Sequence, residues 1–168
     1  MSGHAGYTFF IMSEKSPKKI GEILVEDGVL SRQDLNKALE FQKIEGGLIG
    51  QILIKKGLIQ EDALVAALSK QLQIPYLPLM NYSIDFAVAK IFDQEFCKKN
   101  CLIVVDQDDN GACIVTADPF NDVALASIEQ KLGKKVHAFI ATPTEIMNML
   151  EVAYGQEIPV SQPKTASG

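Results

Sequence analysis

The sequence lacks the residue patterns on which most enzymes and metal sites depend. It has no tryptophan and two histidines, and its three cysteines, Cys97, Cys101 and Cys113, form neither a CxxC pair nor a Cys/His metal spacing. It contains no GxxxxGK(S/T) phosphate-binding loop and no GxSxG context around a serine. We therefore predict a protein that is not an enzyme and binds no metal, with the reduced cysteines typical of a cytoplasmic location.

Long apolar runs and an excess of basic residues are absent as well. No apolar run approaches the roughly 18 residues that a membrane-spanning helix needs, so we expect no membrane insertion. The formal net charge of −5 argues against a nucleic-acid polymer as a partner, because phosphate backbones select basic surfaces. A small phosphate ligand is still compatible with this charge, since it needs only local donors.

The composition of both ends of the chain predicts disorder. Residues 1–17 contain a short apolar patch without the basic start or cleavage site of a signal peptide, and the residues from Ser161 onward are polar. The composition changes after Leu72. We expect four segments, which are a disordered leader (1–17), a helical half (18–72), a small α+β half (73–157) and a disordered tail (158–168).

The segment 19–42 is repeated at 48–71. The two copies are identical at nine of 24 positions and are separated by a five-residue spacer, 43–47. In each copy the apolar residues follow the three-and-four spacing of a short helix, which stops at Gly28 or Gly57 before a longer helix begins. The repeat therefore predicts two helical hairpins that pack side by side.

Two pairs of repeated residues are unusual for a purely structural hairpin. Gly21 and Gly50 lie at a helix start, where glycine costs about 1 kcal/mol relative to alanine, which suggests that something approaches the backbone closely. Gln42 and Gln71 are polar identities at the end of the longer helix in each copy. Packing and capping explain the other identities, and these two pairs are candidates for ligand binding as well as for packing.

The doubled segment resembles the paired 24-residue motif of the MshEN domain, the N-terminal domain of type II secretion and type IV pilus assembly ATPases. The resemblance covers 19–71 and includes the helix-start glycines, the five-residue spacer and both closing glutamines. It implies a cytoplasmic, non-catalytic regulatory domain that binds cyclic di-GMP and acts with a secretion or pilus machinery protein. Each motif of that family holds one half of the ligand.

The resemblance also implies a set of ligand-binding positions in each copy. Glycine amides would donate to phosphate, glutamine amides would pair with a guanine edge, and aliphatic side chains would form a platform for the bases. In the first copy these positions are Lys19, Ile20, Gly21, Leu24, Val25, Gly28, Leu30, Leu39 and Gln42. In the second copy they are Leu48, Ile49, Gly50, Leu53, Ile54, Gly57, Ile59, Leu68 and Gln71.

Two positions depart from the family motif, which begins with arginine. Lys19 supplies a point charge in place of the planar guanidinium group of arginine, and Leu48 supplies no charge. Losing one charge-assisted contact would cost about 1.5–3 kcal/mol of binding free energy. Two hypotheses follow: a cyclic di-GMP receptor, or a protein–protein adaptor of the same machinery with a degenerate nucleotide site. The sequence also leaves open whether the chain is a stand-alone protein or a fragment of a longer ATPase.

The second half has the pattern of a small α+β domain. It predicts a helix, a hairpin, a second helix, a strand and a last helix, which form a sandwich-like unit with a mixed sheet of three or four strands and one covered face. The helices are expected at 86–99, 121–132 and from 143, and the strands at 101–105, 113–117 and 135–141. The stretch from Thr116 to Pro119 also resembles the family, and we interpret it as a turn rather than a ligand contact.

Overall fold

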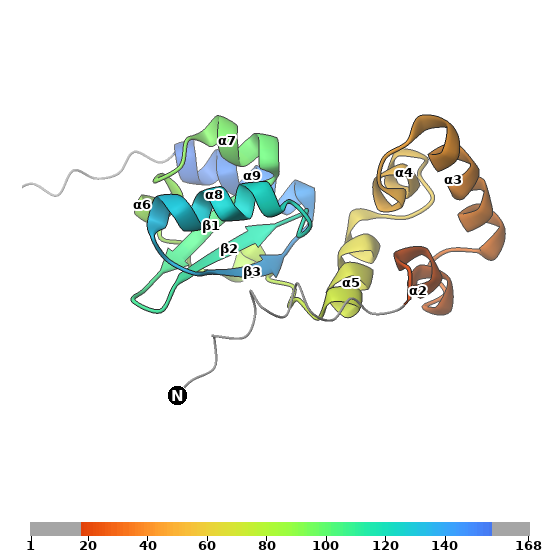
Figure 1. Cartoon of the computed structure of the whole chain (residues 1–168), viewed down its shortest axis with the longest axis horizontal. Coiled ribbons are helices and arrows are strands. Elements are labelled where there is room, and N and C mark those ends of the chain that lie inside the picture. The colour runs from red at the N-terminus through yellow and green to blue at the C-terminus, as the bar shows by residue number, and fades with distance from the viewer. Residues whose placement is uncertain (1–17, 156–168) are drawn as a thin grey trace, which may run out of the picture.

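The computed structural model describes residues 18–155 and shows two halves that lie side by side (Figure 1). The predicted leader and tail lie outside the described residues. The helical half contains α2 (Ile20–Glu26), α3 (Arg32–Glu45), α4 (Ile49–Lys55) and α5 (Glu61–Leu72). The α+β half contains η1 (Leu79–Asn81), α6 (Phe86–Ala89), α7 (Gln94–Asn100), β1 (Leu102–Gln107), β2 (Ala112–Thr116), α8 (Asp122–Leu132), β3 (Val136–Ile140) and α9 (Pro143–Gly155).

The helical half consists of the two predicted hairpins, α2–α3 and α4–α5. The chain leaves each short helix through a glycine in the left-handed region, with φ of 73° at Gly28 and 68° at Gly57. Ser31 caps α3 by accepting a hydrogen bond from the backbone nitrogen of Asp34. The apolar faces of the hairpins meet in one core formed by Ile23, Leu24, Leu30, Leu35, Ala38, Ile52, Leu53, Ile59 and Ala67.

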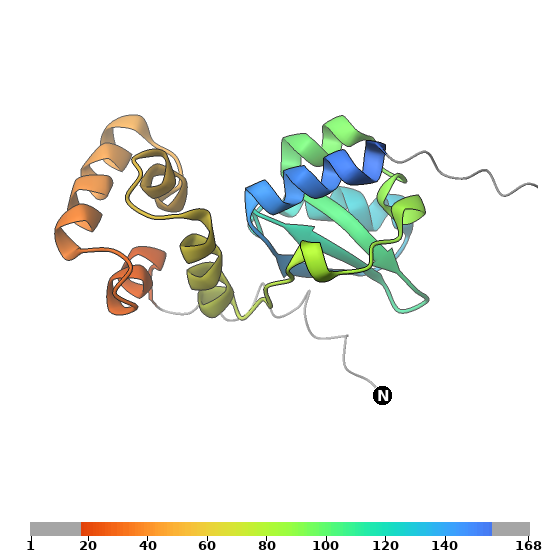
Figure 2. The ribbon, with the colours of Figure 1, turned by 180° about the vertical axis from the view of Figure 1, so that it is seen from behind.

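The sheet of the α+β half is covered on both faces. Strands β1 and β2 are antiparallel and β2 and β3 are parallel, so the three described strands form a mixed sheet. Helix α8 lies on one side of it, and α7 and α9 lie on the other (Figures 1 and 2). The expectation of one covered face is therefore wrong. Four consecutive residues of β1 are at most 1% exposed, namely Leu102, Ile103, Val104 and Val105. In a strand with one solvent-exposed face, buried and exposed residues alternate instead.

The helix predicted over 86–99 is two helices, α6 and α7. The side chain of Asp93 accepts a hydrogen bond from the backbone nitrogen of Phe96 at 2.9 Å and so caps the start of α7. A capping aspartate in the middle of a helical pattern starts a new helix, because it satisfies the amides of that helix's first turn. The hairpin, α8, β3 and α9 are confirmed close to their predicted positions.

Helix α5 joins the two halves. It packs against the end of β3 in a small shared core made of Val65, Leu68, Leu72, Ile74 and Ile140. The linker after α5 forms a parallel bridge between Tyr76 and Ile140. At the start of α5, Glu61 Oε2 accepts a hydrogen bond from the backbone nitrogen of Thr144 at 3.1 Å. These contacts hold the loop that follows β2 next to the helical half.

Candidate functional site

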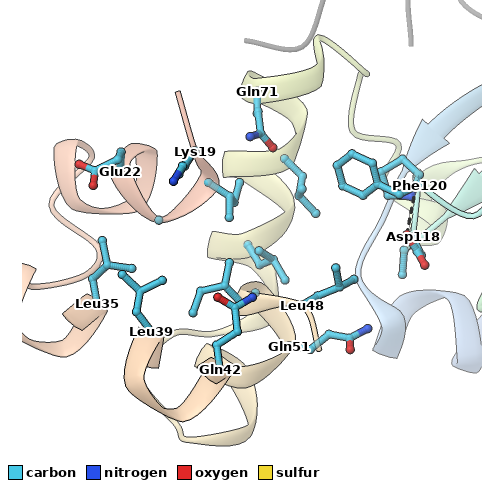
Figure 3. A pocket seen from close by; sticks show the side chains of 18 residues that line it. Lys19, Glu22, Leu35, Leu39, Gln42, Leu48, Gln51, Gln71, Asp118 and Phe120 are labelled. Atoms are coloured by element: carbon cyan, nitrogen blue, oxygen red, sulfur yellow. Dashed lines mark hydrogen bonds between the residues drawn. The ribbon is translucent and has the colours of Figure 1, made fainter. Parts of the chain in front are cut away.

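A pocket of about 410 Å³ lies between the helical half and the loop after β2 (Figure 3). Leucine and isoleucine side chains from α2, α3, α4 and α5 form most of its walls, and residues 117–120 close it from the α+β half. The polar side chains that line it are those of Lys19, Glu22, Gln42, Gln51, Gln71 and Asp118. A concave, largely apolar site with a few polar groups is typical of small-molecule binding.

The glutamines that close the two copies point into the pocket from opposite ends (Figure 3). Gln71 Nε2 donates to the carbonyl oxygen of Lys18 at 3.0 Å, and Gln42 Nε2 donates to the carbonyl oxygen of Gly47 at 2.9 Å. Lys18 and Gly47 each directly precede a copy, so the repeat relates the two bonds. Because a carbonyl oxygen can only accept, each bond fixes the amide orientation and leaves the glutamine Oε1 able to accept from a ligand.

The two helix-start glycines are buried, and each receives a leucine side chain of its own copy. A Cβ added at Gly21 would lie 2.5 Å from Leu35 Cδ1, and one added at Gly50 would lie 2.7 Å from Leu64 Cδ1. The close approach expected at these glycines is therefore made by leucines of the longer helices. Both glycines and both leucines line the pocket, so this packing sets the shape of its floor.

The two ends of the pocket are formed by equivalent backbone positions of the two copies but carry different side chains. We call Lys19, Glu22 and Gln71 the first end, and their repeat counterparts Leu48, Gln51 and Gln42 the second end. Glu22 Oε1 accepts a hydrogen bond from Arg32 at 2.7 Å, which holds the pKa of Glu22 below its usual range. The first end thus carries an ammonium and an ionised carboxylate, whereas the second end is neutral.

The short helices α2 and α4 begin at the pocket without a side-chain cap. Neither Lys19 nor Leu48, the residues at their N-cap positions, makes a side-chain hydrogen bond to the first turn. Helices α3 and α8, in contrast, are capped by Ser31 and Asn121. The difference leaves first-turn amides of both short helices beside the pocket without a capping side chain.

The loop after β2 is a turn that also lines the pocket. The backbone nitrogen of Asp118 donates to Thr116 Oγ1 at 3.0 Å, and that of Phe120 donates to Asp118 Oδ1 at 3.0 Å. The predicted turn is therefore present. It also places Asp118 and Phe120 at the pocket, opposite the helical half (Figure 3). Phe120 is 45% exposed, so its ring is able to cover a bound ligand.

The structure separates the implied ligand-binding positions into two groups. Those that line the pocket are Lys19, Ile20, Gly21, Leu39, Gln42, Leu48, Ile49, Gly50, Leu68 and Gln71. The others lie outside it: Leu24, Leu30, Leu53 and Ile59 in the helical core, Val25 and Ile54 against that core, and Gly28 and Gly57 in the turns. The second group supports the hairpins that carry the first group.

The pocket also contains residues that are not among the ligand-binding positions implied by the sequence. They are Glu22, Leu35, Gln51, Leu64, Ala117, Asp118, Pro119 and Phe120. Leu35 and Leu64 are identities of the repeat, and an apolar identity of this kind predicts core packing as readily as a place in a pocket. The family resemblance of Thr116 to Pro119 is a signal for the loop, although no spacing in the sequence indicates that it approaches the helical half.

The remaining chemistry-bearing residues of 18–155 include neither a metal-binding cluster nor an activated thiol. No group of three or more histidine, cysteine, aspartate or glutamate side chains in this range is arranged to hold a metal ion. Burial raises the pKa of the thiols of Cys97 and Cys113, and that of Cys101 to about 11, so these thiols are weak nucleophiles at neutral pH. No helix within the described range is both long and apolar enough to cross a membrane.

Sequence comparisons connect the chain with ATPases. A family model described as the MshEN domain matches residues 72–160. The type IV pilus assembly ATPase PilB of Myxococcus xanthus is 28% identical over 141 residues, which are 84% of this chain and 25% of PilB. PilB of Thermus thermophilus is 28% identical over 154 residues, which are 90% of this chain and 17% of PilB. The chain thus spans a quarter or less of the length of these relatives.

Solved structures share the fold. The structure of MshE with cdg superposes with a TM-score of 0.70 at 25% identity and covers 82% of this chain and 99% of the MshE chain. The N-terminal domain of XpsE superposes with a TM-score of 0.63 at 21% identity and covers 79% of this chain and 91% of the other. Since 82% of the chain exceeds either half alone, the likeness to MshE extends over both halves.

Proposed function

The chain belongs to the MshEN domain family, and on this basis we propose that it is a non-catalytic regulatory domain that binds cyclic di-GMP in the pocket between its halves. Its protein partner is a component of a type IV pilus or type II secretion machine. Two similarities support the proposal. PilB is a pilus assembly ATPase, and the MshE structure was solved with cdg, which is cyclic di-GMP.

The observation that carries the proposal is the matched placement of Gln42 and Gln71 at opposite ends of one pocket. A cyclic dinucleotide has two bases that can be related by two-fold symmetry, and the repeat presents two amide oxygens in an equivalent relation. Each oxygen can accept from the N1–H or N2–H groups of a guanine. The aliphatic walls between the ends would cover the faces of the bases.

The pocket also offers groups that can contact the phosphates and the exposed side of the ligand. Helices α2 and α4 begin with residues that line the pocket and have no side-chain cap, so their first-turn amides can donate to phosphate oxygens, assisted at the first end by Lys19. Phe120 can stack on a base from the α+β half. A ligand held in this way would touch both halves of the domain at once.

The charge of the pocket favours a second candidate function. Among the described residues that line it, Lys19 carries the single positive charge, whereas Glu22 and Asp118 are acidic. A ligand with two phosphates gains little from this balance. The second candidate is therefore an adaptor that contacts the same machinery through protein surfaces and has a degenerate nucleotide site.

Isothermal titration calorimetry distinguishes the two candidates. Cyclic di-GMP is titrated into the purified chain, whose folded state is first verified by thermal unfolding. Receptor function predicts one ligand per chain with a dissociation constant of about ten micromolar or tighter, near −7 kcal/mol. The absence of heat at several times that concentration would exclude the receptor. Capture of a pilus or secretion component by the same ligand-free sample would then favour the adaptor.

A further inference from the structure

The two ends of the pocket carry the same amide group but different residues beside it. Gln71 Nε2 donates at 3.0 Å to the carbonyl oxygen of the residue that precedes Lys19, so the glutamine amide lies close to this lysine in the fold. Gln42 Nε2 makes the equivalent bond at 2.9 Å to the residue that precedes Leu48. Lys19 and Gln71 therefore lie together at one end of the pocket, and Gln42 lies at the other (Figure 3).

The Lys19 ammonium is available to a ligand. No salt bridge among residues 18–155 engages it. The carboxylate of Glu22 points away from the pocket and forms a salt bridge of 2.7 Å with Arg32, which balances its charge (Figure 3). The carboxylate of Asp118 accepts a hydrogen bond from a backbone nitrogen of its own loop. The first end thus offers a positive charge next to an amide oxygen that can accept.

The second end offers the amide oxygen without the charge. Leu48 stands at the position of Lys19, is 50% exposed and can make only apolar contacts. Gln42 keeps its Oε1 atom able to accept, because its nitrogen is engaged. A charge-assisted hydrogen bond to phosphate is stronger than a neutral one and changes affinity by about tenfold or more. The two ends should therefore hold a nucleotide with unequal strength.

We propose that the first end is a nucleoside-phosphate site by itself, which binds one nucleoside monophosphate while the second end stays empty. Gln71 accepts from the base, and Lys19 donates to the phosphate. This inference rests on the proposed function and specifies how the same pocket divides its ligand. In a cyclic dinucleotide, the second nucleotide binds at the weaker end because the covalent link raises its effective concentration there.

A nuclear magnetic resonance titration of the full 15N-labelled chain with guanosine 5′-monophosphate tests the inference. The side-chain amide signals of Gln71 should report a dissociation constant at least about tenfold lower than those of Gln42. Guanosine lacks the phosphate and inorganic phosphate lacks the base, so each should require at least about tenfold higher concentrations to shift the Gln71 signals. Equal dissociation constants at the two glutamines would overturn the inference. So would guanosine or inorganic phosphate that acts at Gln71 as strongly as the monophosphate.

Cyclic di-GMP in the same titration separates the inference from the proposed function. Binding of cyclic di-GMP without any shift by the monophosphate at about 10 mM would overturn the inference and leave the proposed function intact. Failure of both ligands would overturn both. Binding of the monophosphate alone at the first end would support a nucleoside-phosphate site and contradict the cyclic ligand.

Variants at the two positions that differ test the cause of the inequality. Lys19→Leu should weaken the binding of guanosine 5′-monophosphate reported by Gln71 at least about tenfold. Leu48→Lys should bring the dissociation constant reported by Gln42 within about fivefold of that reported by Gln71. Lys43→Leu removes an exposed lysine of α3 outside the pocket and should change neither value. Unchanged values in both pocket variants would contradict the assignment, and the unaltered chain decides the matter if either variant fails to fold.

Discussion

Gln71, at the end of α5, donates a hydrogen bond from Nε2 to the carbonyl oxygen of Lys18, 53 residues earlier in the chain. Its counterpart, Gln42, makes the equivalent bond to Gly47. Each glutamine therefore anchors the start of the other copy and holds its own amide oxygen in a fixed direction. This relation gives a physical reason why glutamine recurs at the end of both copies, since the same side chain closes the repeat and lines the pocket.

Replacement of Gln71 by leucine should weaken both folding and binding. The variant removes a hydrogen bond to the backbone, so the free energy of unfolding should fall by about 1 kcal/mol in urea titrations. It also removes an acceptor for a base, so the affinity for cyclic di-GMP should fall about tenfold or more in calorimetry. Gln130→Leu, at an exposed position of α8, is the matched control and should change neither quantity. Equal effects of the two variants would argue against the role of Gln71.

Leu48→Arg should increase the affinity for cyclic di-GMP. Arginine at this half-exposed, pocket-lining position would supply a charge-assisted contact to a phosphate or to a guanine edge, worth about tenfold in affinity. Ile44→Arg adds the same charge at a position that is 82% exposed and outside the pocket. A similar gain in both variants would mean that net charge, and not the contact at Leu48, governs binding.

Gly21→Ala should destabilise the helical half. The added methyl group would meet Leu35 Cδ1 at 2.5 Å, and Leu35 is itself buried, so the free energy of unfolding should fall by about 1–3 kcal/mol. Gly155→Ala adds the same methyl group where nothing lies within 4 Å, and it should be neutral within about 0.5 kcal/mol. A stable Gly21→Ala variant in urea titrations would show that Leu35 moves away freely.

Phe120→Ala should lower the affinity for cyclic di-GMP with little effect on folding. Phe120 is 45% exposed, so its removal should change the free energy of unfolding by less than about 0.5 kcal/mol. Loss of one base-stacking contact should weaken binding by about 1–3 kcal/mol, measured by calorimetry. Val123→Ala, at a nearby position that is 79% exposed and outside the pocket, provides the control. Unchanged affinity in Phe120→Ala would exclude stacking of a base on Phe120.

The stability that the linker after α5 gains from Tyr76 should depend on pH above about 10. Tyr76 Oη donates to Glu145 Oε1 at 2.6 Å, and this bond raises the pKa of Tyr76 from 10.0 to about 12. Because the folded-state pKa is the higher one, the stabilisation is complete below pH 10 and is lost as the pH rises toward 12. Tyr76→Phe should cost about 1 kcal/mol of unfolding free energy at neutral pH and progressively less in alkali. If the difference in unfolding free energy between Tyr76→Phe and the unaltered chain does not change with pH, this assignment is contradicted.

The helical half was largely predictable because its information is local. Gly28 and Gly57 mark the ends of the short helices, Ser31 with Asp34 marks the start of α3, and the repeat shows that two copies must share one core. The hairpin positions follow from these signals alone. Ten of the positions implied by the resemblance line the pocket, because the starts of both short helices and the C-terminal parts of both longer helices lie there.

Three features of the α+β half and of the pocket differ from the sequence-based expectation, for different reasons. The split between α6 and α7 was missed because the apolar pattern continues past Asp93, although that aspartate is a good capping residue. The two covered faces of the sheet were indicated by the unbroken apolar run from Leu102 to Val105. The placement of Asp118 and Phe120 at the pocket depends on how α5 packs against β3, and no local pattern specifies that arrangement.

A nuclear magnetic resonance titration of the 15N-labelled chain with cyclic di-GMP tests directly whether the pocket is the nucleotide site. If the ligand binds in this pocket, the side-chain amide signals of Gln42 and Gln71 and the backbone signals of Gly21 and Gly50 should shift together and saturate at one ligand per chain. Signals of the control residue Gln130 should stay in place. Shifts that leave both glutamine side chains unaffected, or no shifts at saturating ligand, would contradict the claim that this pocket is the nucleotide site.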